Sequence, residues 1–150
     1  MSVQIKPNID SKFINIPFVK DGRSLEGTDC LGLVYLWYAY HGVMFEEARD
    51  TGSEAASFWW AQDPKRYIEG MNQYGRTLAF FELRRHDMIL FFDPAINSSM
   101  PIEAGIMVDD RHFLWTRRDG VSETQMLNAL FKNKFWGGLR LHKVVEARIR

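Results

Sequence analysis

The sequence contains a single cysteine among its 150 residues, and its acidic and basic side chains cancel to a formal net charge of zero. One cysteine cannot form a disulfide within the chain, so nothing in the composition requires an oxidising compartment. The charge balance argues against a nucleic-acid-binding tail. No apolar run reaches the roughly 18 residues of a membrane-spanning helix. We therefore expect no nucleic-acid partner and no membrane segment.

The start of the chain also lacks the pattern of a secretion signal, because MSVQIKPNIDSKF has no basic stretch followed by an apolar core. The chain is rich in hydrophobic residues (46%) and aromatic residues (14%), enough for one sizeable core. We expect one domain over residues 1–150, with no secretion address of its own and no second domain.

The stretch GTDCLGLVYLWYAYHGV (residues 27–43) predicts a central helix with the only cysteine, Cys30, in its first turn. Thr28 or Asp29 suits the N-cap, and a glycine after the histidine suits the stop. Residues 30–41 are apolar on nearly every face, which indicates a buried helix rather than a superficial one. Cys30 would then lie at the head of a buried helix.

The rest of the sequence changes period after Gly75. Residues 46–50 and 54–72 look helical, whereas later segments are short runs of aromatic and branched residues separated by turn signals. These later segments are TLAFFEL, DMILFFD, EAGIMVD, HFLWTR and FWGGLRLHKVV. Helices followed by a mostly antiparallel sheet predict an α+β fold in which the helices pack on the sheet.

A helix N-terminus can stabilise a thiolate, but a cysteine nucleophile usually also needs a histidine within hydrogen-bond reach. His41 would lie about 16 Å from Cys30 along the helix axis, too far to act as its base. His86 and His112 open strands at turn edges, where an exposed histidine is the more common case. Nothing in the sequence brings His142 to the sulfur. Spacing alone therefore leaves a Cys–His enzyme possible but unsupported.

Several motifs resemble one known family. IPFVKDGRSLEGTDCLGLV resembles the cysteine segment of the NlpC-type papain-like peptidases, and HDMILFF, EAGIMVDDRHFLW and GGLRL are similar to strands that follow it there. The resemblance runs in order from Asn15 to His142. The GRSLEGTDCLGLV form followed by HGV most resembles the branch found among bacteriophage tail-associated proteins. The resemblance implies a papain-like, NlpC-type α+β fold with N-terminal helices packed on a mostly antiparallel sheet.

The family cleaves stem peptides of bacterial peptidoglycan without a cofactor, so the resemblance implies neither a cofactor nor a metal. Its catalytic nucleophile corresponds to Cys30. Its base histidine corresponds to Glu103, and its orienting residue to Trp115. An ionised Glu103 would raise the thiol pKa, and a neutral carboxylic acid is a poor base at neutral pH. Trp115 would tend to fill the cleft.

Three further positions are implied on the substrate side of the site. The family tyrosine that helps stabilise the oxyanion corresponds to Phe18, the aspartate before the nucleophile to Asp29, and the serine after it to Leu31. Loss of the tyrosine hydroxyl removes a donor of a kind that can be worth about 100-fold in rate. Base, orienting residue and oxyanion donor are all changed, which predicts weak or absent peptidase chemistry.

Three hypotheses follow. In the first, the chain is a degenerate, structural NlpC-like domain of a phage tail tip or baseplate hub, made in the host cytoplasm and carried in the virion. Its partners are other tail or baseplate proteins, with residues 57–71 and 146–150 as candidate contacts. In the second, it is an active peptidoglycan endopeptidase that uses Cys30 with an unrecognised base such as His112 on stem peptides. In the third, it is a cytosolic protein with an inert cysteine and a chance resemblance.

Overall fold

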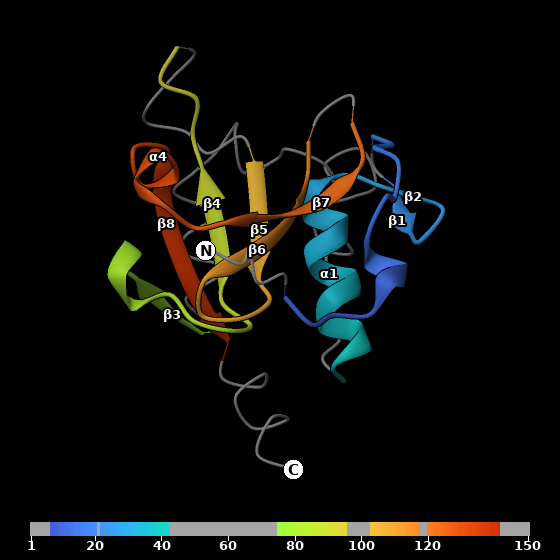
Figure 1. Ribbon diagram of the computed structural model, residues 1–150, viewed down its shortest axis with the longest axis horizontal. Coiled ribbons are helices and arrows are strands. Elements are labelled where there is room, and N and C mark those ends of the chain that lie inside the picture. The colour runs from blue at the N-terminus through green and yellow to red at the C-terminus, as the bar shows by residue number, and fades with distance from the viewer. Residues whose placement is uncertain (1–6, 21, 43–74, 96–102, 118–119, 142–150) are drawn as a thin grey trace, which may run out of the picture.

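A computed structural model describes residues 7–20, 22–42, 75–95, 103–117 and 120–141. Within these ranges a long helix, α1 (Cys30–Tyr40), packs on a six-stranded antiparallel sheet with the order β3-β8-β4-β5-β6-β7 (Figure 1). The strands are β3 (Gly75–Leu78), β4 (Met88–Phe91), β5 (Glu103–Met107), β6 (His112–Thr116), β7 (Ser122–Met126) and β8 (Phe135–Leu141). This architecture confirms the predicted α+β class and mostly antiparallel sheet.

The remaining described elements are short. They are η1 (Ser11–Phe13), the hairpin of β1 (Arg23–Ser24) and β2 (Gly27–Thr28), η3 (Phe80–Glu82) and α4 (Ala129–Lys132). The helices expected over 46–50 and 54–72, and the candidate contact segments 57–71 and 146–150, lie outside the described residues. No helix among the described residues has the length and hydrophobicity needed to cross a membrane.

The predicted strand over residues 77–83 was only partly right, because the chain leaves the sheet after Leu78. The Glu82 carboxylate accepts a hydrogen bond from the Ala79 N–H at 2.8 Å, which closes a short turn of 3-10 helix. That turn replaces the second half of the expected strand.

Helix α1 begins and ends as local chemistry predicts. Asp29 is its N-cap, and the carboxylate accepts a hydrogen bond from the Gly32 N–H at 2.8 Å. Gly42 follows the helix with φ at 84°, a left-handed conformation that glycine adopts without steric cost. Most of the residues between them are buried, so α1 is the central helix that its sequence indicated.

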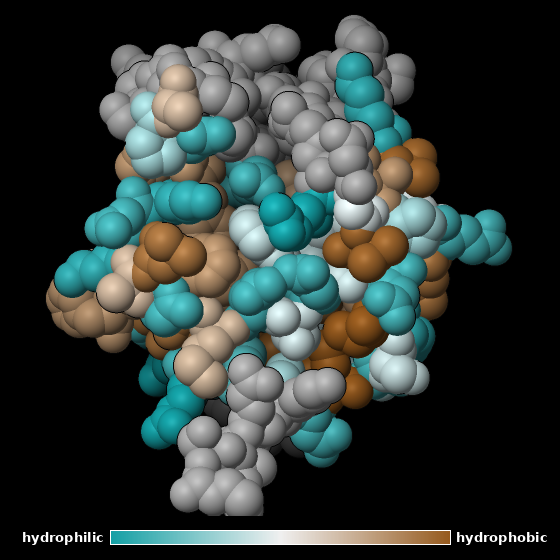
Figure 2. All heavy atoms as spheres, turned by 45° about the horizontal axis from the view of Figure 1, so that its top comes forward, coloured by the Kyte–Doolittle hydropathy of each residue, from teal (hydrophilic) through white to brown (hydrophobic). Residues whose placement is uncertain are grey.

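The sheet separates two hydrophobic clusters because successive strand residues point to opposite faces. The first cluster lies between α1 and the sheet and includes Cys30, Ala104 and Leu114. The second lies on the other face and includes Trp115 and Phe131. On the molecular face drawn in Figure 2, exposed hydrophobic side chains form small patches among polar ones.

Candidate functional site

The sulfur of Cys30 lies where the first turn of α1 meets the start of β5. Cys30 is the first residue of the helix and is only 2% exposed. The backbone N–H groups of Ala104, in β5, and of Leu31 donate hydrogen bonds toward the sulfur. Donors of this kind favour a thiolate, so the local backbone is arranged as a nucleophilic cysteine would require.

The wider surroundings of Cys30 have the opposite effect. Burial is the largest influence on the thiol and raises its pKa, and the charges of Asp29 and Glu103 raise it further. Together these outweigh the two backbone donors and raise the pKa of Cys30 from 9.0 to about 12. The thiol is therefore protonated and weakly nucleophilic at neutral pH.

Glu103, the family base position, lies at the start of β5, where its charge acts on Cys30. It is the first residue of β5, half-buried, and adjacent to the Ala104 N–H that faces the sulfur. The sequence placed the family base at this position, and the carboxylate is close enough for its charge to act on Cys30. The charge of Glu103 raises the pKa of Cys30 and is therefore unfavourable for a thiolate, and the catalytic role of this position stays a prediction.

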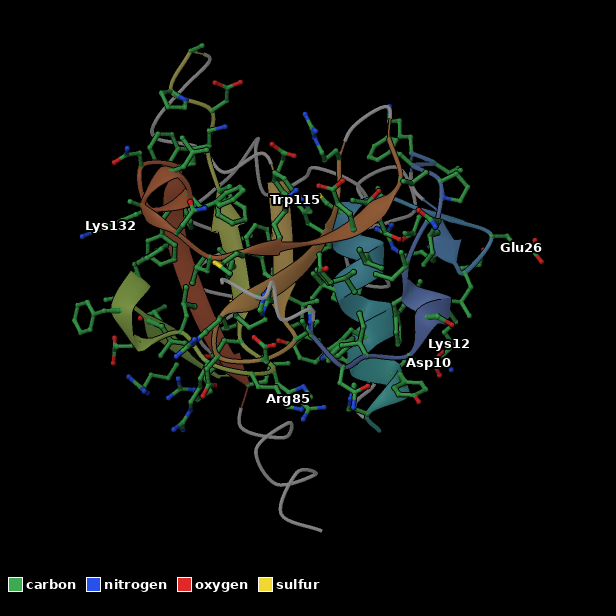
Figure 3. The ribbon with its side chains drawn as sticks, in the orientation of Figure 1. Asp10, Lys12, Glu26, Arg85, Trp115 and Lys132 are labelled. Carbon is green, nitrogen blue, oxygen red and sulfur yellow. The ribbon has the colours of Figure 1, made fainter. Side chains whose placement is uncertain are left out.

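Trp115 occupies a different environment from the one that its family position suggested. Its ring packs among Phe91, Phe113 and Phe131, with centroid distances of 5.7, 5.4 and 5.6 Å. Its indole N–H points to the Glu123 carboxylate at 3.5 Å. The side chain thus fills the hydrophobic cluster on the face of the sheet away from α1, at the upper end of the sheet in Figure 3.

The three predicted substrate-side positions are largely internal. Phe18 is half-buried, and its segment forms a bridge with Thr28, two residues before the cysteine. Leu31 is fully buried in the first hydrophobic cluster. The Asp29 side chain is 1% exposed. The side chains of Leu31 and Asp29 are therefore buried within the protein and are not open to a substrate.

Sequence reasoning missed the partner of Asp29. The Arg23 guanidinium donates to the Asp29 carboxylate at 2.7 Å and also to the Gly22 carbonyl at 2.8 Å. Arg23 belongs to β1, and the chain returns through β2 directly into the N-cap of α1. The sequence does contain an indication of this contact, because Arg23 and the capping Asp29 lie on either side of a turn-forming segment that folds as a short hairpin.

The histidines of the described residues lie far from Cys30. His41 is the C-cap of α1, and its ring is 4.6 Å from that of His86, whose Nδ1 accepts a hydrogen bond from Trp37. Trp37 is seven residues beyond Cys30, which corresponds to about 10 Å along the helix. His86 is 4% exposed, so the expectation of an exposed histidine was wrong. It is held by contacts with the end of α1.

His112 is also buried, at 9% exposure, contrary to the expectation for a strand edge. Its Nδ1 lies 3.0 Å from an Asp109 carboxylate oxygen, and its carbonyl accepts a hydrogen bond from the Val108 N–H. Val108 is four residues from Ala104, or about 13 Å along the strand. His112 is therefore at the end of the sheet opposite to the sulfur and is not placed to serve as its base.

The described residues contain no group of three or more histidine, cysteine, aspartate or glutamate side chains that could hold a metal ion. The candidate site is the buried Cys30 thiol, on which the charges of Asp29 and Glu103 act. A cysteine that heads a central helix packed on an antiparallel sheet is the arrangement of papain-like cysteine peptidase folds. The chain belongs to the NlpC/P60 family, which matches residues 15–140. The hypothesis of a chance resemblance is thereby excluded.

Solved structures agree with this family assignment. An NLP/P60-family protein similar to a lipoprotein, from Staphylococcus aureus, superposes with a TM-score of 0.56 and 17% identity over 87% of this chain and 38% of its own. The NlpC/p60 domain of the peptidoglycan hydrolase SagA superposes with a TM-score of 0.54 and 14% sequence identity, and the match covers 87% of this chain and 91% of that domain. An NlpC/P60 family protein from Bacillus cereus superposes with a TM-score of 0.59 and 18% sequence identity, and the match covers 86% of this chain and 36% of that protein.

At these identities the similarity establishes the fold. This chain spans nearly all of the SagA domain but well under half of the other two proteins. No curated protein matches the chain. The predicted NlpC-type fold is confirmed, and the roles of individual site residues stay predictions.

Proposed function

We propose that the chain is a component of a bacteriophage tail tip or baseplate hub whose NlpC/P60 domain has lost peptidase activity and serves a structural role. On this proposal it is made in the host cytoplasm and carried in the virion, where other tail or baseplate proteins are its partners. One observation carries the loss of activity: burial and two neighbouring carboxylates hold the pKa of Cys30 at about 12.

The positions of the bases support the same proposal. A cysteine peptidase requires an imidazole within hydrogen-bond reach of its thiol. The described residues instead place Glu103 beside Cys30, and their three histidines lie at the other end of α1 and of the sheet. Neither carboxylate state replaces the imidazole, because the ionised form repels a thiolate and the neutral form is a weak base.

The assignment to a phage tail rests on the sequence around the cysteine. Residues 22–34, GRSLEGTDCLGLV, and the HGV that closes the helix resemble the tail-associated branch of the family. Exposed apolar side chains on segments near the helix N-terminus are compatible with protein contacts. They are Val19, Leu25 and Val121, which are 46%, 43% and 40% exposed.

The loss of activity is tested by incubating the purified chain with peptidoglycan fragments and measuring released peptides by mass spectrometry. The SagA domain serves as a positive control for the substrate, and Cys30→Ala sets the background. We expect release by the chain to equal that of Cys30→Ala. Turnover that this substitution abolishes would instead establish the alternative function, an active peptidoglycan endopeptidase that aids penetration of the cell wall.

The structural role is tested in a phage that encodes the chain. Cys30→Ala particles should assemble and infect as the wild type does, whereas deletion of the domain should give tails without complete tips in electron micrographs. Normal tails after deletion would contradict a role in assembly. Defective infection by structurally normal Cys30→Ala particles would contradict the loss of catalysis.

A further inference from the structure

Strand β7 forms one edge of the six-stranded sheet, next to β6 (Figure 1). In the described part of the chain, only the beginning of its outer side is covered, and the N-terminal segment covers it. The Ser122 N–H donates to the Ile16 carbonyl at 2.8 Å, and the Ser122 carbonyl accepts a hydrogen bond from the Asn15 N–H at 2.9 Å. The outer side of β7 is thus already used once for strand-like pairing.

The N-terminal segment leaves β7 directly after this contact. Asn15 has a φ of 65°, in the left-handed region that asparagine tolerates better than most residues, and the chain before it forms η1. Phe13 packs on Trp37 of α1. Within the described ranges, no backbone group of the N-terminal segment bonds to β7 beyond Ser122. The rest of the outer side of β7 has no strand against it.

Thr124 and Met126 direct their backbone groups to this uncovered side. In an antiparallel pair, successive residues direct their N–H and C=O groups alternately to one neighbour and to the other. Because Ser122 directs both groups outward, Thr124 and Met126 do so as well, whereas Gln125 bonds to β6. No described residue pairs with the outward groups of Thr124 or Met126. A row of unpaired backbone groups is a template for another strand.

The sequence of β7 lacks the features that usually protect an edge strand. Proteins commonly place prolines, lysines or bulges at such edges. Ser122–Met126 reads SETQM, without proline or lysine, and its register with β6 runs through five consecutive pairs without a bulge. Its single charged side chain, Glu123, is directed along the sheet to Trp115 and Gln125. The edge is therefore regular and open to a further strand.

Glu123 determines which kind of strand this edge would accept. The Trp115 indole and the Gln125 amide are neutral donors, and both bind the same carboxylate oxygen, Oε2. No lysine or arginine of the described ranges forms an ion pair with this half-buried side chain. Side chains that lie opposite each other on paired strands are about 5 Å apart, and opposite charges there are stabilising. A basic side chain on an added strand would thus supply the cation that Glu123 lacks.

We propose that β7 is a docking edge for an extended, basic segment of a partner protein, which adds a further strand to the sheet. The segment bonds to the backbone of Thr124 and Met126 and places basic side chains on the face of Glu123. Its alternate side chains are apolar and lie beside Met126, which is 46% exposed. The docking edge does not depend on chemistry at Cys30. It rests on the proposed structural role only in taking the partner to be a tail or baseplate protein.

The test titrates the isotope-labelled full chain with a short peptide of alternating lysine and valine, blocked at both ends. The control peptide has glutamate at every lysine position. We expect the lysine peptide to shift the backbone amide resonances of Thr124 and Met126. The glutamate peptide should bind at least about tenfold more weakly, because like charges then face each other at Glu123.

Variants of β7 separate the backbone contribution from the charge. Thr124→Pro removes one outward N–H, which an edge strand tolerates, and should weaken binding of the lysine peptide at least about tenfold. Thr124→Ala keeps that N–H and should bind as the wild type does. Glu123→Lys should reverse the preference between the two peptides, which covers the case in which Thr124→Pro does not fold.

Several results would overturn the proposal. They are a lysine peptide that does not bind, equal affinities for the two peptides, an unchanged preference in Glu123→Lys, and resonance shifts confined to residues outside β7. Sedimentation of a wild-type dimer that Thr124→Pro dissociates would assign the edge to a second copy of this chain instead. Peptide binding is measured apart from tail assembly and from peptidoglycan cleavage, so its failure would leave the proposed function to its own tests.

Discussion

At the scale of single residues, Cys30 shows that a helix N-terminus does not by itself make a cysteine reactive. The helix dipole and the backbone donors of Leu31 and Ala104 favour the thiolate, yet these effects are small beside removal of the sulfur from water. Two carboxylates near the sulfur act in the same direction as burial. The balance is set by what surrounds the helix end rather than by the helix.

The first prediction concerns the reactivity of this thiol. A pKa of about 12 instead of 9.0 lowers the thiolate fraction at neutral pH by about a thousandfold, and burial slows access further. Iodoacetamide should therefore modify Cys30 at least about a hundredfold more slowly in the native protein than in urea. The native rate should keep rising with pH beyond 10. Rapid native alkylation at pH 7.5, with saturation near pH 9, would show an activated or ordinary thiol.

A second prediction separates the causes of the raised pKa. Burial is the largest, the charge of Asp29 is next among those that raise it, and the charge of Glu103 is smaller. In pH profiles of alkylation, Glu103→Gln should lower the pKa of Cys30, and Asp29→Asn should lower it more. Neither should restore an ordinary thiol, because the sulfur remains buried. Glu103→His should lower the pKa further than the matched Glu103→Gln, since an imidazolium can pair with the thiolate.

At the scale of elements, the start of α1 depends on Asp29. The carboxylate caps the helix through the Gly32 N–H and pairs with Arg23. Asp29→Ala removes both contacts and should lower the free energy of unfolding by about 1–2 kcal/mol. Asp29→Asn keeps a capping oxygen and should lose less. Urea denaturation measures both, and equal losses would show that the charge matters more than the cap.

The elements that the sequence predicted well are those whose pattern is local. α1 has a capping aspartate, an apolar body and a terminal glycine, and β4, β5 and β6 are apolar runs bounded by turns. β7 was missed because Ser122–Met126 reads SETQM, which has no apolar alternation. This strand pairs with β6 along its whole length, and the Ser122 hydroxyl also bonds Phe13 and Ile16 in a distant part of the chain.

The site residues divide in the same way. The proximity of Cys30 and Glu103 was predictable because family order fixed the pairing of helix and strand. The burial of His86 and His112 could not be predicted from the sequence. His86 is held by a hydrogen bond from Trp37, and His112 by contact with Asp109 in the preceding turn. The place of Trp115 depends on which face of β6 carries it. Its neighbours there come from β4, β6 and α4, so a local sequence pattern does not specify them.

At the scale of the whole molecule, a largely buried ion pair joins β8 to the turn that leads into its neighbour β4. Arg140 in β8 donates two hydrogen bonds to Asp87, which precedes β4, and a third to the Glu82 carbonyl. The Asp87 side chain is 1% exposed. Arg140→Met would leave the Asp87 carboxylate buried without this cationic partner. The substitution should lower the free energy of unfolding by about 3–5 kcal/mol, as measured by urea denaturation. The double variant Asp87→Asn/Arg140→Met should recover part of that loss, and failure to recover any would assign it to packing.

The N-terminal segment connects α1 to the far edge of the sheet, and Ser122 makes the connection. Phe13 packs against Trp37 of α1 with ring centroids 5.2 Å apart. The Ser122 hydroxyl donates to the Phe13 carbonyl at 2.6 Å and accepts from the Ile16 N–H at 2.8 Å. Because Ser122 is fully buried, this hydroxyl satisfies two backbone groups that have little access to water.

Ser122→Ala should therefore lower the free energy of unfolding by about 2 kcal/mol, the usual cost of leaving buried polar groups unsatisfied. Ser24→Ala is the matched control, because the Ser24 hydroxyl accepts a single exposed hydrogen bond from Glu26. That variant should change stability by less than about 0.5 kcal/mol. Equal urea midpoints for the two variants would mean that the N-terminal segment is held to β7 by its backbone bonds and by Phe13 packing, without a contribution from the Ser122 hydroxyl.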